Sequence, residues 1–469
     1  MSKSFLKRFF VFFLWGLLAV WLVSCVIIPL FHKKIDSDYL ASISPSVSFT
    51  NPAPEQVRSI DNNKDALLWR LRLVESAQKN LVITTFAFSD DNSGTDFLSA
   101  VKAAADRGVE VRILIDGMDG SLNLSHSPVL KALISMPNVQ AKLYNPINLL
   151  KPWRLNYRMH DKYVIADDCA YLLGGRNTND LFLGDYSEKS NIDREILVWE
   201  TQNGKGQSFL QLRSYFESIW SLPCCKQLTS SLSEEKKNTV FSQLDTHYRQ
   251  MQQRFPEAFT STDWKAETIP ANSVSLLSNP QRPQNKEPLL WYSLQQLMQN
   301  GEEIIIQTPY IICNREMYQV FSEITESGKS VQMITNALEN GANPWGCSDY
   351  LNQKEKILKT GSEIFELYKE HSSHTKTMLI DNHLSVVGSF NLDMRSAYLD
   401  TEMMLLIDCP ELNAQLRCQA EQMMQYSNHV LPNGQEIAGE QYHPPKTGFL
   451  KTAIYTVLRV LILPVRHLL

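Results

Sequence analysis

The chain has 469 residues, of which 43% are hydrophobic, 20% charged and 10% aromatic. This length corresponds to two or three domains at roughly 150 residues each, and the composition excludes a collagen-like, coiled-coil or wholly disordered protein. The formal net charge of -5 argues against a strongly basic nucleic-acid-binding protein, while leaving room for local basic patches. The eight cysteines include no CxxC pair and are typical of buried apolar thiols rather than of a disulfide scaffold.

The N-terminus contains an uninterrupted apolar segment. Residues 9–31 carry no charge, and a membrane-spanning helix needs about 20 apolar residues. The basic residues that flank the segment are Lys3, Lys7 and Arg8 on the first side and Lys33 and Lys34 on the second. The small excess on the first side favours an N-terminus inside the cell and the remaining chain outside.

Two other interpretations of this segment remain open. The first is a cleaved secretory signal peptide. The second is a lipoprotein signal, because Leu22–Cys25 resembles a bacterial lipobox and would make Cys25 the lipidated first residue of the mature protein. All three interpretations carry most of the chain across a membrane.

The C-terminal residues 446–469 carry four basic residues, no acidic residue and many apolar residues. Such a segment fits an interfacial helix on an anionic lipid surface, and it equally fits a terminal helix packed on the domain.

The middle of the chain contains two copies of one unit. Residues 80–88 have a counterpart in 304–312, and residues 108–116 have one in 328–336. These segments are β-branched and apolar, which predicts buried strands. They alternate with predicted helices, which favours a parallel or mixed sheet covered on both faces.

The helices are predicted over 95–107 and 317–327, with Gly108 and Gly328 as C-terminal caps. The predicted division of the chain is a membrane anchor or signal (1–31), a linker (32–60), a first half (61–225), a polar helical connector (226–270), a second half (271–430) and a basic apolar tail (431–469).

A string of chemically active residues recurs near the end of each copy at identical spacing. The first copy has His160, Lys162, Asp167, Gly174, Gly175 and Asn177, and the second has His374, Lys376, Asp381, Gly388, Ser389 and Asn391. A single HxK is common by chance, whereas the complete string occurring twice is very specific.

Residues two apart on a strand face the same side, so each HxK presents an imidazole and an ammonium together. Two copies related by a pseudo-twofold axis would bring both pairs face to face, with amide donors from Asn177 and Asn391. This arrangement suits a phosphodiester, which needs neutralised oxygens, a nucleophile and a proton donor. It requires no cofactor or metal, and the sequence shows no His/Cys cluster at zinc spacing.

The doubled string resembles the HxK(x)4D(x)6G[GS]xN motif of the phospholipase D superfamily, and the resemblance covers about residues 60–425. It implies two α/β halves with mixed sheets flanked by helices and an active site at their interface. It also implies that one histidine forms a phosphohistidine while the other acts as acid and base. In many relatives the first motif supplies the nucleophile, which would be His160, with His374 as acid and base; the sequence leaves this order open. Asp167 and Asp381 would be structural members of the motif.

A carboxylate usually orients each such histidine through its other ring nitrogen. Glu402 is predicted to do so in the second copy, and its partner in the first copy is less clearly marked. In the first copy Glu195 matches best and Asp193 is the alternative.

Residues 388–408, with Gln307–Tyr310 and Thr335–Leu338, resemble segments of bacterial cardiolipin synthases. We therefore expect a phosphatidyltransferase that forms cardiolipin from phosphatidylglycerol and a second phospholipid. Hydrolysis of phospholipids, or less favourably of nucleic acid, is the alternative, and two intact motifs argue against a non-catalytic lipid-binding protein. The expected partners are phospholipids and a bacterial membrane, with the catalytic part on its periplasmic or outer side and no nucleic acid.

Overall fold

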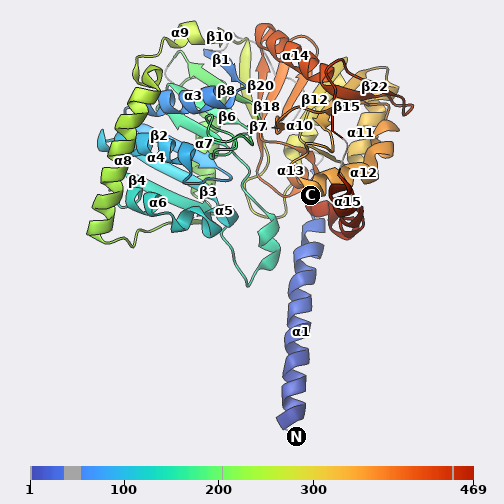
Figure 1. Ribbon diagram of the computed structural model, residues 1–469, viewed down its shortest axis with the longest axis horizontal. Helices are drawn as coiled ribbons and strands as arrows, with labels where there is room; N and C mark the ends of the chain where they lie inside the picture. Colours follow the sequence, from blue (N-terminus) through green and yellow to red (C-terminus); the bar gives the residue numbers. More distant parts are fainter. Residues whose placement is uncertain (1–2, 36–53, 203, 446–447) are drawn as a thin grey trace.

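The computed structural model describes residues 3–35, 54–202, 204–445 and 448–469. Two α/β halves lie side by side, and one long helix projects away from them (Figure 1). Each half is built on a nine-stranded mixed sheet, which confirms the fold class expected from the repeated sequence.

The first half has the strand order β10-β1-β8-β6-β5-β2-β3-β4-β9. The central strands β2, β3 and β4 are parallel and their neighbours are antiparallel. The strands are β1 (Glu55–Ile60), β2 (Asn80–Thr85), β3 (Glu110–Asp116), β4 (Val139–Tyr144), β5 (Tyr163–Ala166), β6 (Ala170–Gly174), β8 (Glu195–Glu200), β9 (Cys225–Gln227) and β10 (Ile269–Pro270). The helices are α3 (Asn63–Ser76), α4 (Asn92–Asp106), α5 (Gly117–Leu122), α6 (Pro128–Leu133), α7 (Gln207–Trp220), α8 (Glu234–Arg254) and α9 (Trp264–Glu267).

The second half repeats this plan in the order β11-β20-β18-β17-β12-β14-β15-β21-β22. Its strands are β11 (Ser273–Ser278), β12 (Glu303–Gln307), β14 (Ser330–Asn336), β15 (Glu363–Leu367), β17 (Thr377–Ile380), β18 (Leu384–Gly388), β20 (Met403–Asp408), β21 (Ser427–Val430) and β22 (Glu436–Ala438). Its helices are α10 (Leu289–Asn300), α11 (Arg315–Glu326), α12 (Pro344–Leu358), α13 (Met394–Tyr398), α14 (Pro410–Gln425) and α15 (Phe449–Leu461). Two short pairs, β7 (Asn191–Ile192) with β16 (Ser372–Ser373) and β13 (Ile311–Ile312) with β19 (Leu392–Asp393), complete the set of strands.

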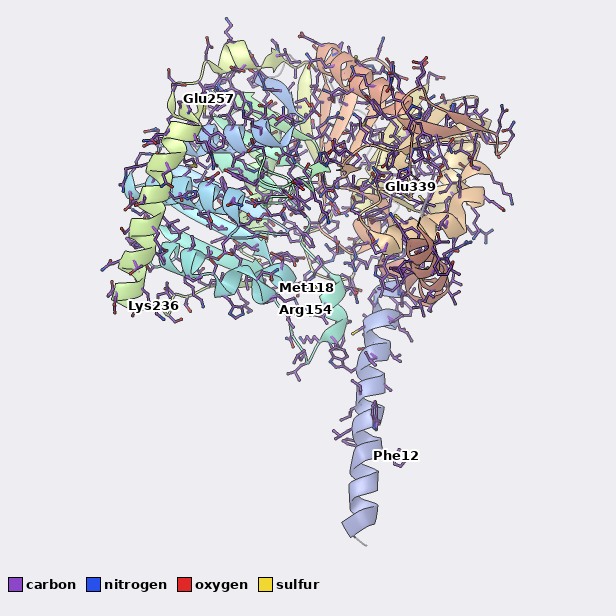
Figure 2. All side chains as sticks on the ribbon, viewed as in Figure 1. Phe12, Met118, Arg154, Lys236, Glu257 and Glu339 are labelled. Atoms are coloured by element: carbon purple, nitrogen blue, oxygen red, sulfur yellow. The ribbon has the colours of Figure 1, made fainter. Side chains whose placement is uncertain are left out.

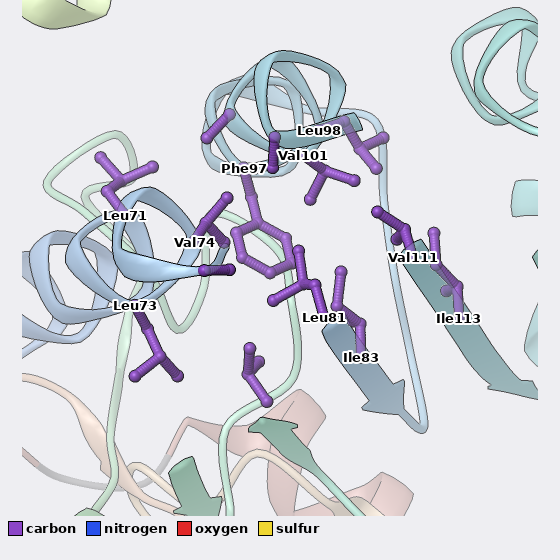
Figure 3. Packing of buried hydrophobic residues seen from close by; sticks show 14 of the residues in the cluster. Leu71, Leu73, Val74, Leu81, Ile83, Phe97, Leu98, Val101, Val111 and Ile113 are labelled. Atoms are coloured by element: carbon purple, nitrogen blue, oxygen red, sulfur yellow. The ribbon is translucent and has the colours of Figure 1, made fainter. Parts of the chain in front are cut away.

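Helices α4 and α11 show why the two copies fold alike. The side chains of Asp91 and Asn314 accept hydrogen bonds from the first turns, as N-caps do. Gly108 and Gly328 follow the two helices with a φ of 90°, a left-handed conformation that glycine adopts without strain. Figure 3 shows Phe97 and Val101 of α4 packing over the apolar strands β2 and β3, which is the burial that stabilises the layer.

The two halves share one hydrophobic core. Leu173 and Val198 of the first sheet belong to the same buried cluster as Val387 and Leu405 of the second sheet. The inner faces of the sheets therefore meet, and this fixes the relative position of the two motifs.

Three segment boundaries predicted from the sequence were wrong. Glu55–Ile60, predicted as linker, is strand β1, whose Val57 and Ile60 are buried against the first half. The predicted connector 226–270 also belongs to the first half, because α8 packs on α4 and β10 pairs with β1. The predicted tail contributes β22 to the second sheet. This strand has only three residues, all exposed, and is too short to show an alternating pattern in the sequence.

The projecting helix is α1 (Lys3–Ile27), which continues into a short 3-10 turn at Ile28–Leu30. Residues 12–30 have a mean hydropathy of 2.4 and are 6% buried, so this helix is long and apolar enough to cross a membrane. Figure 2 shows Phe12 far from the body, whereas Cys25 lies where the helix meets it and accepts a hydrogen bond from the Asn156 side chain at 2.7 Å.

Candidate active site

An exchange of backbone pairing between the halves brings the two motifs together. The N–H of His160 donates to the carbonyl of Thr401 at 3.2 Å, and the N–H of His374 donates to the carbonyl of Ile192 at 2.6 Å. Each histidine is thus paired with the segment of the opposite half that precedes a carboxylate. The two pairings are equivalent under the pseudo-twofold relation between the halves.

The first half-site joins His160 to Glu402. Their Nδ1 and Oε1 atoms are 2.9 Å apart, and Glu402 is fully buried. The hydroxyl of Ser396 donates to Oε1 at 2.6 Å, and the hydroxyl of Ser389 donates to Oε2. The ring of Phe86 meets the imidazole edge-on with 5.1 Å between centroids. These contacts hold Nδ1 and leave Nε2 as the nitrogen available for chemistry.

The second half-site joins His374 to Asp193. Their Nδ1 and Oδ2 atoms are 2.6 Å apart, and the N–H of Arg194 donates to Oδ1 at 2.8 Å. Phe182 meets this imidazole edge-on at 5.0 Å between centroids, as Phe86 does in the first half-site. The orienting groups therefore match in position but differ in chemical identity.

Two buried lysines supply positive charge. Lys162 and Lys376 are each 1% exposed, and each donates to the backbone carbonyl of the histidine two residues before it. The side-chain oxygens of Asn177 and Asn391 are buried, and none of the described residues donates a hydrogen bond to them. The site thus combines cations and amides in a dry environment, which strengthens their interaction with an anion.

Burial lowers the pKa of both histidines, and the lysines lower it further. The pKa of His374 falls to about 4, and the pKa of His160 falls well below its ordinary value. Lys162 and Lys376 each act on the histidine of the opposite half as well as on their own, so all four groups form one electrostatic unit. Burial also lowers the pKa of Lys162 to about 7 and that of Lys376 to about 8.

The two carboxylates respond in opposite directions. Burial raises the pKa of Glu402 to about 8, despite the opposing effect of Lys162. Burial acts on Asp193 in the same sense, but Lys376 and His374 outweigh it and hold the pKa of Asp193 at about 2. At neutral pH Asp193 is therefore ionised, whereas Glu402 is largely protonated.

The structure corrects the choice between Glu195 and Asp193. The two oxygens of Glu195 accept hydrogen bonds from Arg70 at 2.5 and 2.6 Å, and the carboxylate that contacts His374 is that of Asp193. Strand register shows the reason: Gly174 pairs with Glu195, whereas Gly388 pairs with Met404. The counterpart of Glu195 is thus Met404, and the residues two positions earlier, Asp193 and Glu402, are equivalent. The loop before Asp193 is longer than the loop before Glu402, so counting from the motif misses this match.

The remaining motif residues have structural positions. Asp167 accepts hydrogen bonds from three successive backbone N–H groups at Gln78–Asn80, and Asp381 accepts from Glu302 and Glu303. Each aspartate thereby joins the β-hairpin of its motif to the start of the neighbouring central strand. Substituting a side chain at Gly174 or Gly388 would place a Cβ 2.4 or 2.1 Å from a carbonyl oxygen of the adjacent strand.

Several residues around the site were missed by the sequence analysis. Ser396 orients Glu402, and its place in the Arg-Ser pair after the second motif was the available signal. Phe86 and Phe182 were not predicted, because Phe86 aligns with Pro309 of the other copy and Phe182 lies in an irregular loop. A cavity of about 170 Å³ adjoins His374, and it is lined mainly by polar and small residues: Asn191, Tyr310, Asn336, Asn343, Cys347 and Ser373.

Comparison with known families agrees with this geometry. Residues 71–220 and 294–424, together more than half of the chain, match the family model described as "Cardiolipin synthase, PLD-like domain". The chain therefore belongs to this family of the phospholipase D superfamily. Within this family, the chain combines an N-terminal apolar helix with a cardiolipin synthase-like domain.

Individual relatives and one solved structure are similar to this chain over most of its length. An uncharacterized protein of Helicobacter pylori (strain ATCC 700392 / 26695) is 24% identical over 422 residues, covering 81% of this chain and 82% of the relative. Cardiolipin synthase C of Escherichia coli K12 is 28% identical over 398 residues, covering 75% and 81%. The crystal structure of phosphatidylserine synthase from Haemophilus influenzae Rd KW20 superimposes with a TM-score of 0.62 at 16% identity, covering 88% of this chain and 95% of that structure, which supports the fold alone.

Proposed function

We propose that the protein is a phosphatidyltransferase that forms cardiolipin from phosphatidylglycerol and a second phospholipid. The observation that carries this proposal is the pair of buried histidine–carboxylate half-sites, each with its own lysine, meeting between the two halves. The family match and the similarity to cardiolipin synthase C of E. coli support the choice of substrate class.

The charge difference between the carboxylates supports an order of events. Burial and the lysines keep His374 unprotonated in the free protein, but ionised Asp193 opposes them and would stabilise a proton once this histidine takes one up, which suits it to give and take a proton. His160 lies beside a largely neutral Glu402 and has a strongly lowered pKa, so its unprotonated Nε2 is available as the nucleophile.

In the first step His160 Nε2 attacks the phosphorus of the donor lipid, a nitrogen–phosphorus bond forms, and the bond to the head-group alcohol breaks. Protonated His374 gives its proton to the departing alkoxide. The bound phosphodiester anion favours this protonated state, because it adds a negative charge beside the imidazole. Lys162 and Lys376 neutralise the nonbridging oxygens as charge develops on them.

In the second step His374 removes a proton from a hydroxyl of phosphatidylglycerol. The resulting oxygen attacks the phosphohistidine, the phosphodiester of the product forms, and His160 is released. Water in place of the lipid alcohol would give phosphatidic acid instead. Burial favours transfer over hydrolysis, because the side chains of His160 and His374 are only 11% and 21% exposed.

We also infer that α1 is a retained membrane anchor, with the catalytic halves on the outer side of the membrane. Three hydrogen bonds support retention, because they join the last turns of the helix to the body: Trp21 Nε1 to the Leu149 carbonyl at 2.8 Å, Asn156 to the Cys25 carbonyl at 2.7 Å, and His467 to the Val26 carbonyl at 2.7 Å. Cleavage or lipidation at Cys25 would remove or alter these contacts.

The test is lipid mass spectrometry on purified full-length protein in vesicles containing phosphatidylglycerol and an isotopically labelled second phospholipid. We expect cardiolipin, with the label reporting the donor. The variants His160→Ala and His374→Ala should be inactive, while His443→Ala, an exposed histidine away from the site, should match the wild type. Phosphatidic acid without cardiolipin would contradict the transferase and support the hydrolase.

A further inference from the structure

Apolar side chains are exposed on two segments at the end of the molecule from which α1 projects. The first is the tip of the loop between β4 and the first motif, where Leu149 is 69% and Leu150 is 90% exposed. The second is helix α15, next to the point where α1 leaves the body (Figure 1). Its exposed apolar residues are Phe449, Leu450, Ile454, Val457, Val460 and Leu461.

The loop tip lies beside the apolar part of α1. Trp21 donates its indole N–H to the carbonyl of Leu149, and it lies ten residues before the end of the uncharged segment at Phe31. At 1.5 Å per residue this separation is about 15 Å, roughly half of a 30 Å hydrocarbon core. If α1 spans a bilayer, the loop tip therefore reaches the acyl chains of the outer leaflet.

The backbone of the tip is suited to this depth. A chain in the hydrocarbon region must satisfy its polar groups internally. The N–H of Leu150 donates to the Asn148 side chain and the N–H of Lys151 to the Asn148 carbonyl, both at 3.0 Å. The tip carbonyl at Leu149 is the one that accepts from Trp21.

Helix α15 presents one apolar face outward and uses the other to bind the body. Leu450, Ile454, Val457 and Leu461 follow helical spacing and are 46–73% exposed, whereas Tyr455 is buried. Three basic residues of the tail are engaged by the protein: Lys451 donates to the Glu339 carbonyl, Arg459 to the Asn352 side chain and Arg466 to the Asp349 side chain. The two expectations for this segment are therefore compatible, since the helix packs on the domain and still exposes an apolar stripe.

We propose that the Leu149–Leu150 tip and the outer face of α15 form one membrane-binding surface. The tip inserts among the acyl chains, and α15 lies in the interface between lipid and water. Continuity with α1 selects lipid as the occupant, because the loop tip contacts this membrane-spanning candidate through Trp21 and α15 lies next to the point where it leaves the body (Figure 1).

The proposed membrane-binding surface also connects to the active site. Lys451 and Tyr455 of α15 bond to the carbonyls of Glu339 and Leu338. That segment continues into Gly341–Asn343, which lines the cavity beside His374. The loop behind the tip likewise continues through Asn156 into His160. Lipid contact therefore supports both walls of the site, which would orient its opening toward a membrane-bound substrate.

The experiment measures how deeply each segment lies in the bilayer and requires no catalysis. A negative result would therefore count against the membrane-binding surface and not against the proposed function. Full-length protein lacking the accessible Cys25, Cys169 and Cys418 and keeping the five buried cysteines would carry one introduced cysteine, at Leu150, Val457 or Lys265. This cysteine would be labelled with an environment-sensitive fluorophore in vesicles. Lys265 is an exposed residue of α9, at the end of the molecule opposite α1 (Figure 1). Quenchers would be lipids spin-labelled in the acyl chain or head group, and aqueous iodide.

We expect the Leu150 probe to be quenched most by acyl-chain labels, the Val457 probe by head-group labels and the Lys265 probe by iodide. Iodide quenching of the Leu150 and Val457 probes equal to that of the Lys265 probe would overturn the proposal. Protection from all quenchers together with crosslinking between chains would also overturn it, because a second copy would then cover the face.

A second measurement rests on the proposed function. In Leu149→Asp/Leu150→Asp the turnover in vesicles should fall about tenfold, because two carboxylates oppose insertion, while turnover in lipid–detergent micelles stays within twofold. The control is Leu210→Asp, an exposed leucine of α7 that should behave as wild type in both systems. If the double variant loses turnover equally in vesicles and in micelles, it has a folding defect, and the result contradicts the proposed membrane-binding surface.

Discussion

The two half-sites are alike in geometry and unlike in charge. Each has a histidine held through Nδ1 by a carboxylate of the opposite half, a lysine two residues later and an aromatic ring against the imidazole. Yet the pKa of Asp193 is lowered to about 2 while that of Glu402 is raised to about 8. A duplicated fold can therefore place two identical imidazoles symmetrically and still give them different roles through their immediate neighbours.

The glycine–serine difference between the motifs gives the two carboxylates different surroundings. At Ser389 a hydroxyl reaches Glu402 and supports its longer side chain. At the equivalent Gly175 a Cβ would lie 2.5 Å from Asp193 Oδ1, so the shorter carboxylate approaches the backbone where a side chain would stand. The hydroxyls around Glu402 lower its pKa, but burial outweighs them, whereas at Asp193 the charges of Lys376 and His374 outweigh burial.

The largest expected effect comes from removing either histidine. His160→Ala and His374→Ala should each lower turnover by at least about 10³-fold, because in the proposed mechanism one removes the nucleophile and the other the proton donor. A phosphodiester with a nitrophenol leaving group separates them, since that group departs without a proton. Intact-protein mass spectrometry should then show a phosphorylated adduct in His374→Ala and none in His160→Ala. The opposite pattern would exchange the two roles.

The carboxylates should differ in sensitivity. Asp193→Asn removes an ionised partner of His374 and should lower kcat about 100-fold. Glu402→Gln resembles the protonated acid that predominates at pH 7 and should cost about tenfold or less. Steady-state kinetics at pH 7 measures both, and a larger loss in Glu402→Gln would show that the charge difference is not used.

The pH dependence should report the lysines. As pH rises through 7 and 8, Lys162 and then Lys376 lose the protons that neutralise the phosphate, so kcat/KM should fall on the alkaline side, approaching tenfold per pH unit for each lysine. In Lys376→Arg one cation is retained to high pH, so the residual activity of this variant should decline less steeply. A kcat/KM that stays constant from pH 7 to 9 would contradict the lowered pKa of both lysines.

Glu195 should affect stability more than catalysis. Glu195→Gln breaks its two-pronged ion pair with Arg70 and leaves a buried guanidinium unpaired, which should reduce the free energy of unfolding by about 3 kcal/mol. Thermal unfolding measures this against Glu110→Gln, an exposed control on β3. If Glu195→Gln has normal stability and loses as much kcat as Asp193→Asn, Glu195 acts in the active site after all.

The smallest effect should come from the hydroxyl that supports Glu402. Ser389→Ala loses one hydrogen bond and should lower kcat about two- to tenfold. The comparison is Gly175→Ala, which should cost more than tenfold because its Cβ crowds Asp193. Equal effects in the two variants would show that the two positions do not tune their carboxylates differently.

The sequence predicted the repeated α/β fold because apolar strands and capped helices leave local patterns, such as Gly108 after α4 and Gly328 after α11. It also located both HxK motifs, because side chains that act together on one strand keep a fixed spacing. It did not distinguish Asp193 from Glu195, since both lie on one face of an extended segment and the preceding loop has no constrained length. Strand β22 left no signal because three residues are too few to show an alternating pattern.

The sequence by itself determined the chemistry available to this protein: two histidines, two lysines, two asparagines and an apolar N-terminal segment, each readable from local order. The tertiary structure alone decided which half supplies each carboxylate, because the pairing of His160 with Thr401 and of His374 with Ile192 joins residues that are far apart in the chain. It also decided the charge of those carboxylates, since pKa values depend on burial and on cations that approach from the other half. Such through-space distances are not encoded in local spacing, and they turn a repeated motif into two different half-sites.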